Sequence, residues 1–233
     1  MNEAVKQVAI VIVVSIIGLI GITYFFTSSF GGSDVRNNES IIVNEQSEPI
    51  VINPDNQNDI SNMNNPKAVV ETNRGTFTLE LFEDVMPITV GNFISLAEEG
   101  FYDGIQFHRV IEGFMIQAGD PNTKEEDTSR YVQGGPGYTI QDEFVIDERL
   151  TNVRGTISMA NTGQPNSGGS QFFINTNDNT NLDHDKQPLT SRHPVFGRVI
   201  SGYEIVEIIE TTETDMRDLP VDRVVIERVT IER

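Results

Sequence analysis

The run FHRVIEGFMIQAGD, which begins at Phe107, is the part of the sequence whose residue types and spacing most suggest chemistry. Side chains two residues apart on a strand share a face, so Phe107, Arg109 and Ile111 would lie together. Phe114 and Met115 follow closely along the chain. A guanidinium among large apolar side chains suits the floor of an apolar pocket with one fixed hydrogen-bond donor. A surface arginine whose stem covers apolar residues is the alternative.

The sequence lacks the residues or motifs that several other common kinds of active or binding site require. The chain has no cysteine, which excludes disulfides, thiolate metal sites and a cysteine nucleophile. The three histidines, His108, His184 and His193, lie far apart and have no carboxylate pattern around them. No G-x-S-x-G elbow or phosphate-binding loop is present, and the glycines at 134–137 and 168–169 are interpreted as tight turns. We therefore expect neither a metal nor a cofactor.

Charge restricts the partners of the chain. Its 233 residues include 16 Lys and Arg against 35 Asp and Glu, a formal net charge of −19. Nucleic acids and anionic lipid surfaces both reward positive charge. Neither is therefore expected as the main partner.

The N-terminal segment has the character of a membrane anchor. Residues 1–7 include Lys6, and residues 8–26 carry no charge. A helix over 8–26 would span roughly 28 Å, about the hydrocarbon thickness of a bilayer. A signal peptide is the alternative, but its apolar core is usually about 7–15 residues long and ends at a small-x-small cleavage site, which is absent here.

Charges on the two sides of this apolar segment predict its orientation. Lys6 precedes it and acidic residues follow, which favours a cytoplasmic N-terminus at residues 1–7. We predict a single-pass protein of the cell membrane whose C-terminal part is extracytoplasmic. Secretion after signal-peptide cleavage is the alternative. Residues 27–66, rich in Asn, Ser and acidic residues, are interpreted as a flexible linker; a strand that docks on the globular domain is the lesser alternative.

Residues 67–233 have the pattern of a mostly β globular domain. Two strands are expected around a turn at 73–75, with Phe77, Leu79 and Leu81 on one face. A helix that Thr89 could cap and Gly100 could end follows, and a second helix is expected at 201–210. Further strand-like runs lie at 105–111, 115–118, 156–159, 171–175, 195–199 and 223–231. Many short strands with two helices predict a closed antiparallel barrel covered at its ends.

Three segments resemble the signature motifs of the cyclophilins. They are the run from Phe107, SMANTGQPNSGGSQFFI from Ser158 and HPVFGRV from His193, and the similarity extends from about Ala68 to Ile231. The run GGPGYTIQDEF at 134–144 looks most like prokaryotic members. The resemblance implies a mainly β fold, a closed eight-stranded antiparallel barrel capped by two α-helices, with a substrate groove on its outer face. It also implies peptidyl-prolyl cis-trans isomerase activity.

The resemblance also assigns site residues. Arg109 resembles the catalytic arginine, and His108 beside it is interpreted as structural. The positions that resemble the proline pocket and its rim are Phe114, Met115, Phe173, Leu182 and His193. Those that resemble the groove positions holding the peptide backbone are Gln117, Ala160, Asn161 and Gln171. Asn181 stands where many eukaryotic members carry a tryptophan that binds cyclosporin.

The function implied is rotation of X-Pro bonds in polypeptides, assisting protein folding outside the cytoplasm. Proline-containing polypeptides are the expected partners, and a monomeric catalytic domain is expected. A non-enzymatic proline-peptide binding module on the same fold is the alternative, because fold alone does not guarantee activity. The sequence departs from compact family members in two elongated loops, at 120–133 and 183–193.

Overall fold

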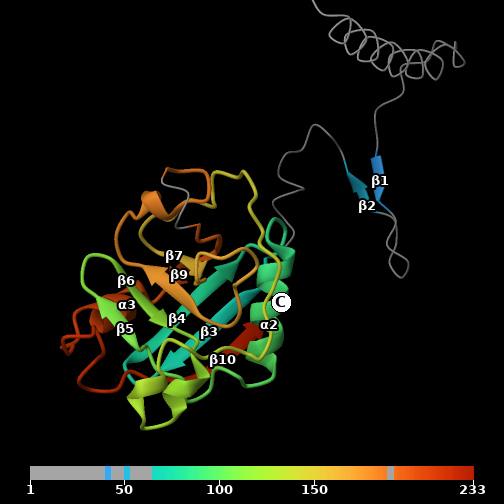
Figure 1. The fold of residues 1–233 in the computed structure, drawn as a ribbon. Coiled ribbons are helices and arrows are strands. Elements are labelled where there is room, and N and C mark those ends of the chain that lie inside the picture. Colours follow the sequence, from blue (N-terminus) through green and yellow to red (C-terminus); the bar gives the residue numbers. More distant parts are fainter. Residues whose placement is uncertain (1–39, 43–49, 53–64, 188–191) are drawn as a thin grey trace, which may run out of the picture. The chain divides into compact units, whose positions relative to one another are not determined.

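The computed structural model describes residues 40–42, 50–52, 65–187 and 192–233 (Figure 1). The chain divides into two units, Met1–Ile60 and Ser61–Arg233. In the first unit, β1 (Ser40–Ile42) pairs antiparallel with β2 (Ile50–Ile52). The apolar clusters of the predicted linker thus form strands that pair with each other.

The predicted transmembrane helix at 8–26 and most of the linker lie outside the described residues, so both stay predictions. Among the helices that the structure does describe, none is both long enough and apolar enough to cross a bilayer.

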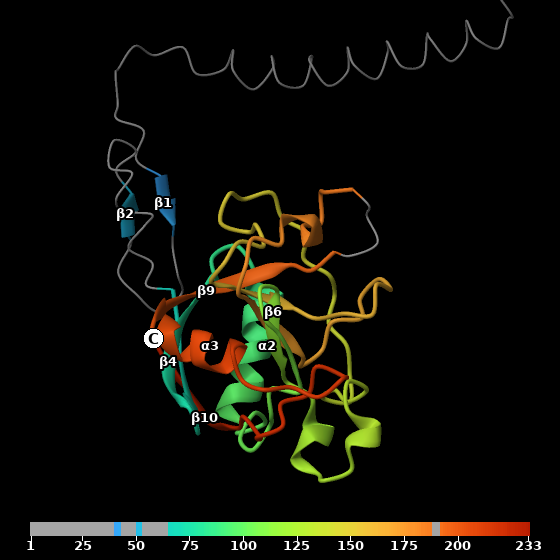
Figure 2. The ribbon, with the colours of Figure 1, turned by 90° about the vertical axis from the view of Figure 1, so that its left-hand side faces the viewer.

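An antiparallel sheet of eight strands forms the second unit (Figures 1 and 2). The order across the sheet is β10-β3-β4-β9-β7-β8-β6-β5. Its strands are β3 (Lys67–Thr72), β4 (Gly75–Leu81), β5 (Arg109–Ile111), β6 (Met115–Ala118), β7 (Thr156–Met159), β8 (Phe172–Asn175), β9 (Val195–Ser201) and β10 (Ile226–Glu232). Each predicted strand is present. The strands predicted at 105–111, 171–175 and 223–231 are shorter than expected, and the last of these also ends one residue later; the strand predicted at 195–199 is longer.

The sheet is an open half-barrel, so the predicted closed barrel is wrong. Its edge strands β5 and β10 share no ladder. Instead, the irregular segment before β5 approaches the segment that leads into β10 through an isolated bridge between Gln106 and Val225. Phe107 N also donates to Val224 O at 2.9 Å. The barrel fails to close because β5 has only three residues and begins beyond this contact.

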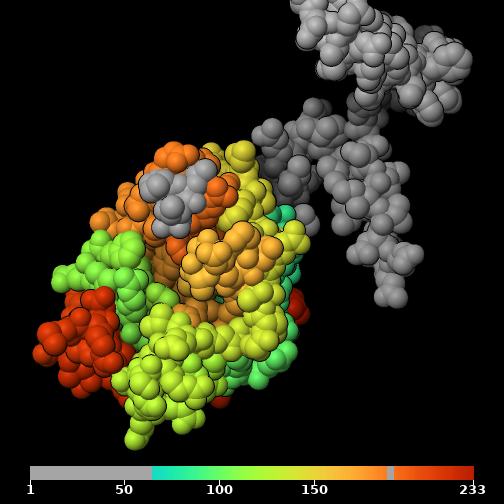
Figure 3. Space-filling view, viewed as in Figure 1, coloured from blue at the N-terminus to red at the C-terminus, as the bar shows by residue number. Residues whose placement is uncertain are grey.

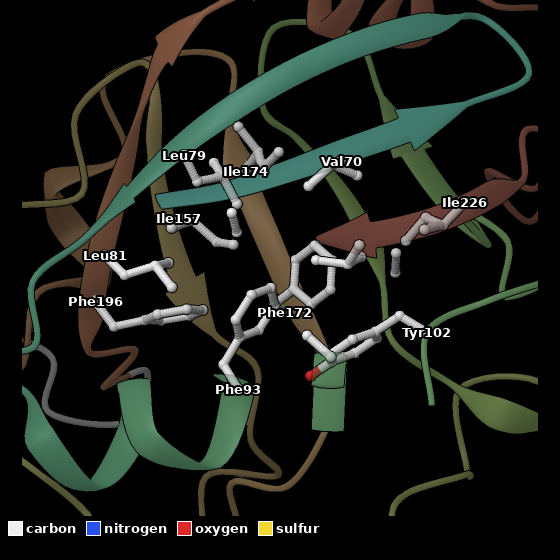
Figure 4. Packing of buried hydrophobic residues seen from close by; sticks show 14 of the residues in the cluster. Val70, Leu79, Leu81, Phe93, Tyr102, Ile157, Phe172, Ile174, Phe196 and Ile226 are labelled. Atoms are coloured by element: carbon white, nitrogen blue, oxygen red, sulfur yellow. The ribbon is translucent and has the colours of Figure 1, made fainter. Parts of the chain in front are cut away.

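The core lies on the inner face of the curved sheet (Figure 4). Phe77, Leu79 and Leu81 alternate along β4 and are buried, as predicted. Phe172 packs edge-on against both Phe93 and Tyr102, with ring centroids 5.6 and 5.7 Å apart. Because interiors are close-packed, this aromatic cluster gives β8 a fixed position against α2 and the turn that follows it.

The helix α2 (Pro87–Glu98) begins differently from the prediction. Pro87 occupies its first turn and Thr89 lies inside the helix, so Thr89 is not the cap. The carboxylate of Glu143 accepts from the backbone N–H groups of Ile88 and Thr89 at 2.9 and 2.6 Å. A distant residue thus caps the free N–H groups of the first turn. Gly100 follows the helix with φ of +70°, as a C-terminal glycine should.

The second helix, α3 (Tyr203–Glu210), begins two residues later than predicted and contacts β4, β5 and β6. Gly202 precedes it with φ of +73°, and a Cβ there would lie 2.4 Å from Thr76 O. This close approach requires glycine. The remaining helical turns are η1 (Pro121–Lys124), η2 (Thr128–Arg130) and η3 (Thr180–Leu182).

Candidate active site

The outer face of strands β5, β6 and β8 carries the candidate site. Arg109 lies opposite Gln117, and Gln117 lies opposite Phe173. The next row, Val110, Ile116 and Ile174, points to the other face and belongs to the core. Since side chains alternate along strands, burying the second row forces the first one outward.

A small apolar cluster separate from the core lies on this outer face. Its buried members are Met115, Phe173 and Leu182, which are 2%, 4% and 8% exposed. Ile111, Phe114 and Ala160 pack against them. The ring of His193 lies edge-on to Phe173, with centroids 5.4 Å apart. The structure therefore brings together the residues predicted to form a proline pocket and its rim.

Arg109 borders this apolar cluster. Its guanidinium carbon lies 6.0 Å from the centroid of the Phe114 ring. Its side chain is 39% exposed, and its Nε atom lies 3.7 Å from Oδ2 of Asp218. No described residue accepts a hydrogen bond from this guanidinium. Arg109 is thus a charged donor placed beside an apolar surface, with N–H groups available to a ligand.

Polar groups line the continuation of this face. Gln117 Nε2 donates to Gln171 Oε1 at 2.9 Å, and Gln171 Nε2 donates in turn to Gly134 O at 2.9 Å. Asn161 Nδ2 donates to Arg192 O at 2.6 Å. These contacts orient three of the side chains predicted to hold a peptide backbone.

A hollow of about 440 Å³ lies among them, bordered by Gln117, Ala160, Asn161, Gln171 and the segment 132–136. In Figure 3 the light-orange loop after β7 stands beside this hollowed part of the surface. The volume is large enough for one or two amino-acid side chains. The apolar cluster and the polar hollow share Ala160, so they form one continuous surface.

Two histidines of the site region are held neutral at pH 7. Burial lowers the pKa of His193, and the hydrogen bond between Nδ1 and Met159 O, 3.2 Å long, opposes this only in part. Since a carbonyl oxygen can only accept, Nδ1 carries the proton. Burial also lowers the pKa of His108, against the attraction of the Asp120 carboxylate. His108 is 3% exposed, which agrees with the structural role expected for it.

A buried polar network surrounds the predicted pocket, and no local pattern in the sequence indicates it. Asn152 donates through its backbone N–H and its Nδ2 to Asp183 Oδ1, at 2.7 and 2.9 Å. The same Nδ2 lies 3.0 Å from His193 O.

A second group of bonds centres on Asn179. Its Nδ2 donates to Phe114 O at 2.7 Å and to Asn175 Oδ1 at 2.8 Å. These bonds fix the backbone on both sides of Leu182.

Asp218 was also missed. It approaches Arg109 from a segment far along the chain, and nothing in the local sequence around residue 218 indicates this partner. His184, which the sequence placed in a surface loop, stacks on Phe144 with centroids 5.3 Å apart. Within the described parts of the chain, no group of His, Asp and Glu side chains is arranged to hold a metal ion.

Comparison with known proteins gives a consistent result. The family model for "Cyclophilin type peptidyl-prolyl cis-trans isomerase/CLD" matches residues 67–231. Peptidyl-prolyl cis-trans isomerase CYP18-1 of Arabidopsis thaliana is 42% identical over 166 residues, which cover 70% of this chain and 94% of that protein. A crystal structure of a cyclophilin type isomerase from Cryptosporidium parvum has a TM-score of 0.62 and 31% identity. It covers 72% of this chain and 97% of the other.

Two further matches add detail. The Cryptosporidium parvum protein in the presence of the dipeptide Ala-Pro gives the same TM-score, identity and coverage of this chain. A Streptococcus pyogenes protein, whose name joins a phosphatase to a peptidyl-prolyl cis-trans isomerase, is 39% identical over 197 residues. Those residues are 75% of this chain but 40% of that longer relative. This chain therefore belongs to the cyclophilin type family and is a peptidyl-prolyl cis-trans isomerase.

Proposed function

We propose that the outer-face surface around Arg109 is the active site for X-Pro rotation in polypeptides. The observation that carries this proposal is the contact of the Arg109 guanidinium with Phe114, at the edge of the cluster of Met115, Phe173 and Leu182. An apolar surface suits a pyrrolidine ring, and the charged donor beside it can reach the prolyl nitrogen. The enzymatic interpretation takes precedence over a non-enzymatic binding module because the relatives bear the name of the enzyme.

The chemistry needs little more than these groups. Rotation about an X-Pro bond must break amide resonance, and the uncatalysed step takes roughly 10–100 s. Midway through the rotation the prolyl nitrogen becomes pyramidal and regains a lone pair. Arg109 can donate to that lone pair more effectively than to the planar ground state. This is stronger binding of the transition state than of the substrate.

The required energy is within reach of such a site. A half-time of milliseconds requires an acceleration of about 10⁴-fold, or roughly 5.5 kcal/mol. A charge-assisted hydrogen bond that is partly shielded from water, together with fixed positioning of the ring, can supply this. Gln117, Ala160, Asn161 and Gln171 would hold the peptide backbone while one side of the bond turns.

We also propose that the enzyme acts outside the cytoplasm, on chains that fold there. This rests on the uncharged segment 8–26 and on the charges that flank it. In this arrangement the linker at 27–66 would separate the isomerase domain, 67–233, from the bilayer. The run at 134–144 supports a place among the prokaryotic members.

The assignment of Arg109 is tested by replacing it in the full-length chain. Arg109→Ala is expected to lower kcat for a proline peptide at least 100-fold, about 2.7 kcal/mol, with an unchanged melting temperature. Arg154→Ala is a matched control, because Arg154 also forms an ion pair, with Glu207, and lies 4.2 Å from the Tyr203 ring. Near-normal turnover of Arg109→Ala, with its fold intact, would overturn the assignment.

A further inference from the structure

The loop between α3 and β10 folds into a short hairpin. Thr214 and Pro220 form an isolated antiparallel bridge, and Asp215 N donates to Leu219 O at 2.8 Å. The side chain of Asp215 also accepts from the backbone N–H groups of Arg217 and Leu219, at 2.8 and 3.1 Å. These bonds give the tip of the hairpin, which contains Asp218, a defined conformation.

The tip of this hairpin reaches the strand that carries Arg109. Val110 N donates to Asp218 O at 2.8 Å, so Asp218 is tied by its backbone to the residue next to Arg109. Its side chain then forms the ion pair with Arg109, with 3.7 Å between Nε and Oδ2. The backbone and the side chain of Asp218 therefore both contact β5.

Asp218 holds a backbone conformation that favours glycine. Its φ is +63°, and among the described residues only Val132 and Asn166 share a positive φ without being glycine. Such a conformation is unfavourable for an L-residue, although aspartate tolerates it better than most. A glycine would fit this backbone without strain and would keep the bond from Val110, but it would lose the carboxylate. The conformation of the hairpin therefore explains the backbone of Asp218 but gives no reason for its carboxylate.

The atoms involved suggest what this carboxylate does. A guanidinium presents Nε and one terminal nitrogen along one edge, and its two terminal nitrogens together at its end. Asp218 approaches the Nε edge, while Phe114 faces the group from the apolar cluster. The terminal N–H groups of Arg109 remain available, since no described residue accepts from them.

We propose that Asp218 is a positioning residue, whose carboxylate holds the Nε edge of Arg109 so that the terminal N–H groups face the prolyl nitrogen. This inference rests on the proposed catalytic role of Arg109. The two side chains are 39% and 45% exposed, so the ion pair is accessible to solvent and salt. The hairpin would thus preorganise the donor before substrate arrives.

The test uses two substitutions in the full-length chain. Asp218→Asn removes the charge and tolerates the positive φ; Asp218→Gly removes the side chain and relieves the backbone. Both are expected to lower kcat about fivefold, the rate equivalent of one exposed ion pair, with little change in KM. Asp218→Gly should do so without a fall in melting temperature. Rising salt should lower kcat of the unmodified chain towards that of Asp218→Asn, because salt screens the pair.

Asp222→Asn serves as a matched control. Asp222 lies just beyond the hairpin, its side chain is 86% exposed, and it pairs with Arg74 at 3.9 Å rather than with Arg109. This variant removes the same charge from nearly the same place and should keep normal turnover. An equal loss in Asp222→Asn would attribute the effect to net charge and overturn the inference.

A double-mutant cycle separates this inference from the proposed function. In an Arg109→Ala background, Asp218→Asn should cause no further loss of the residual rate. The same fivefold loss there would show that Asp218 acts independently of Arg109 and would contradict the inference. If Arg109→Ala abolishes turnover while both Asp218 variants have normal kcat, the inference fails and the function of Arg109 stands. If Arg109→Ala is fully active, both fail.

Discussion

The role proposed for the Arg109 charge depends on the different surroundings on its two sides. On one side lies an apolar cluster that excludes water, and on the other lies a carboxylate open to solvent. A hydrogen bond to a charged donor strengthens as water is displaced from it. A proline ring that covers Phe114, Met115 and Phe173 would displace that water. In the proposed mechanism, substrate binding would therefore itself strengthen the hydrogen bond that Arg109 donates.

Asn181 offers a second test at the residue scale. It is exposed in η3, next to Leu182 of the apolar cluster. The cyclophilin resemblance places a tryptophan here in many eukaryotic members, where an indole supplies a large apolar face and a polar N–H. Asparagine supplies little contact area, so we expect an active enzyme that binds cyclosporin weakly. Asn181→Trp should strengthen inhibition and keep kcat within a few-fold of the unmodified enzyme.

Inhibition curves of the two proteins in the same proline-isomerisation assay provide the measurement. Asn181→Phe is the control that adds apolar area without a donor, and it should recover part of the affinity. Tight cyclosporin inhibition of the unmodified chain, or an unchanged inhibition constant in Asn181→Trp, would show that another residue has this role.

At the scale of elements, the predicted pocket is held by hydrogen bonds from Asn152 to two other segments, at Asp183 and at His193. The Asn152 side chain binds Asp183 and the carbonyl of His193, so it links the segment that leads into β7 to both ends of the elongated loop. It also accepts from Ser158 Oγ at 2.7 Å. Buried groups of this kind specify a unique arrangement only while every partner is satisfied.

Asn152→Ala is therefore expected to destabilise the domain by about 2–4 kcal/mol, since it leaves several buried polar groups without partners. Urea unfolding would measure the loss. Because the network also fixes His193 and Leu182, KM for a proline peptide should rise in the variant that remains folded. Asn177→Ala, which removes an exposed side chain bonded to Gly113 O, is the control and should stay within about 0.5 kcal/mol. A fully stable Asn152→Ala would contradict the importance of the network.

The sequence predicted those features that depend on local pattern. Alternation identified Phe77, Leu79 and Leu81 as core, and Gly100 correctly marked the end of α2. The resemblance assigned the residues of the apolar cluster to one site, and the structure confirms that they lie together. Their roles in substrate binding and catalysis stay predictions.

The features that sequence reasoning missed depend on contacts between distant residues. The cap of α2 comes from Glu143 rather than from Thr89, and the partner of Arg109 is Asp218. The opening of the half-barrel depends on the short length of β5, and the strand pattern at 105–111 overestimated that length. No periodicity encodes a long-range partner or the point at which a ladder ends.

At the scale of the whole molecule, the buried histidines link folding to pH. Burial lowers the pKa of both His108 and His193 in the folded state. In the unfolded chain each titrates near its ordinary value of about 6.5. As pH falls below this value, the unfolded chain takes up protons that the folded one does not. The free energy of unfolding must therefore decrease with falling pH in this window.

We expect urea midpoints to fall steadily between pH 7 and pH 5, and His108→Gln to reduce the slope. The carboxyl groups whose pKa is lowered, including Asp147, lose their contribution only below about pH 4, outside this window. A midpoint that stays constant from pH 7 to pH 5 would show that the two histidines are accessible to protons in the folded state.

The proposed membrane anchor gives a prediction for the intact cell. The full-length protein should sediment with membranes and resist extraction by high salt, because a 19-residue apolar helix is held by hydrophobic burial rather than by charge. Protease added outside intact cells should digest the domain from Lys67 onward. Release as a soluble form with a new N-terminus near residue 30 would establish cleavage of a signal peptide instead.

The pairing of β3 with β10 has a consequence for how the enzyme is made. These are the first and last strands of the domain, and their ladder joins Lys67 to Glu232. During synthesis β3 leaves the ribosome early, yet its outer neighbour is among the last segments to appear. The domain can complete its sheet only after translation of its final strand. An isomerase domain built in this way reaches its native state only once β10 has left the ribosome, and until then one edge of β3 is exposed to chaperones or to wrong partners.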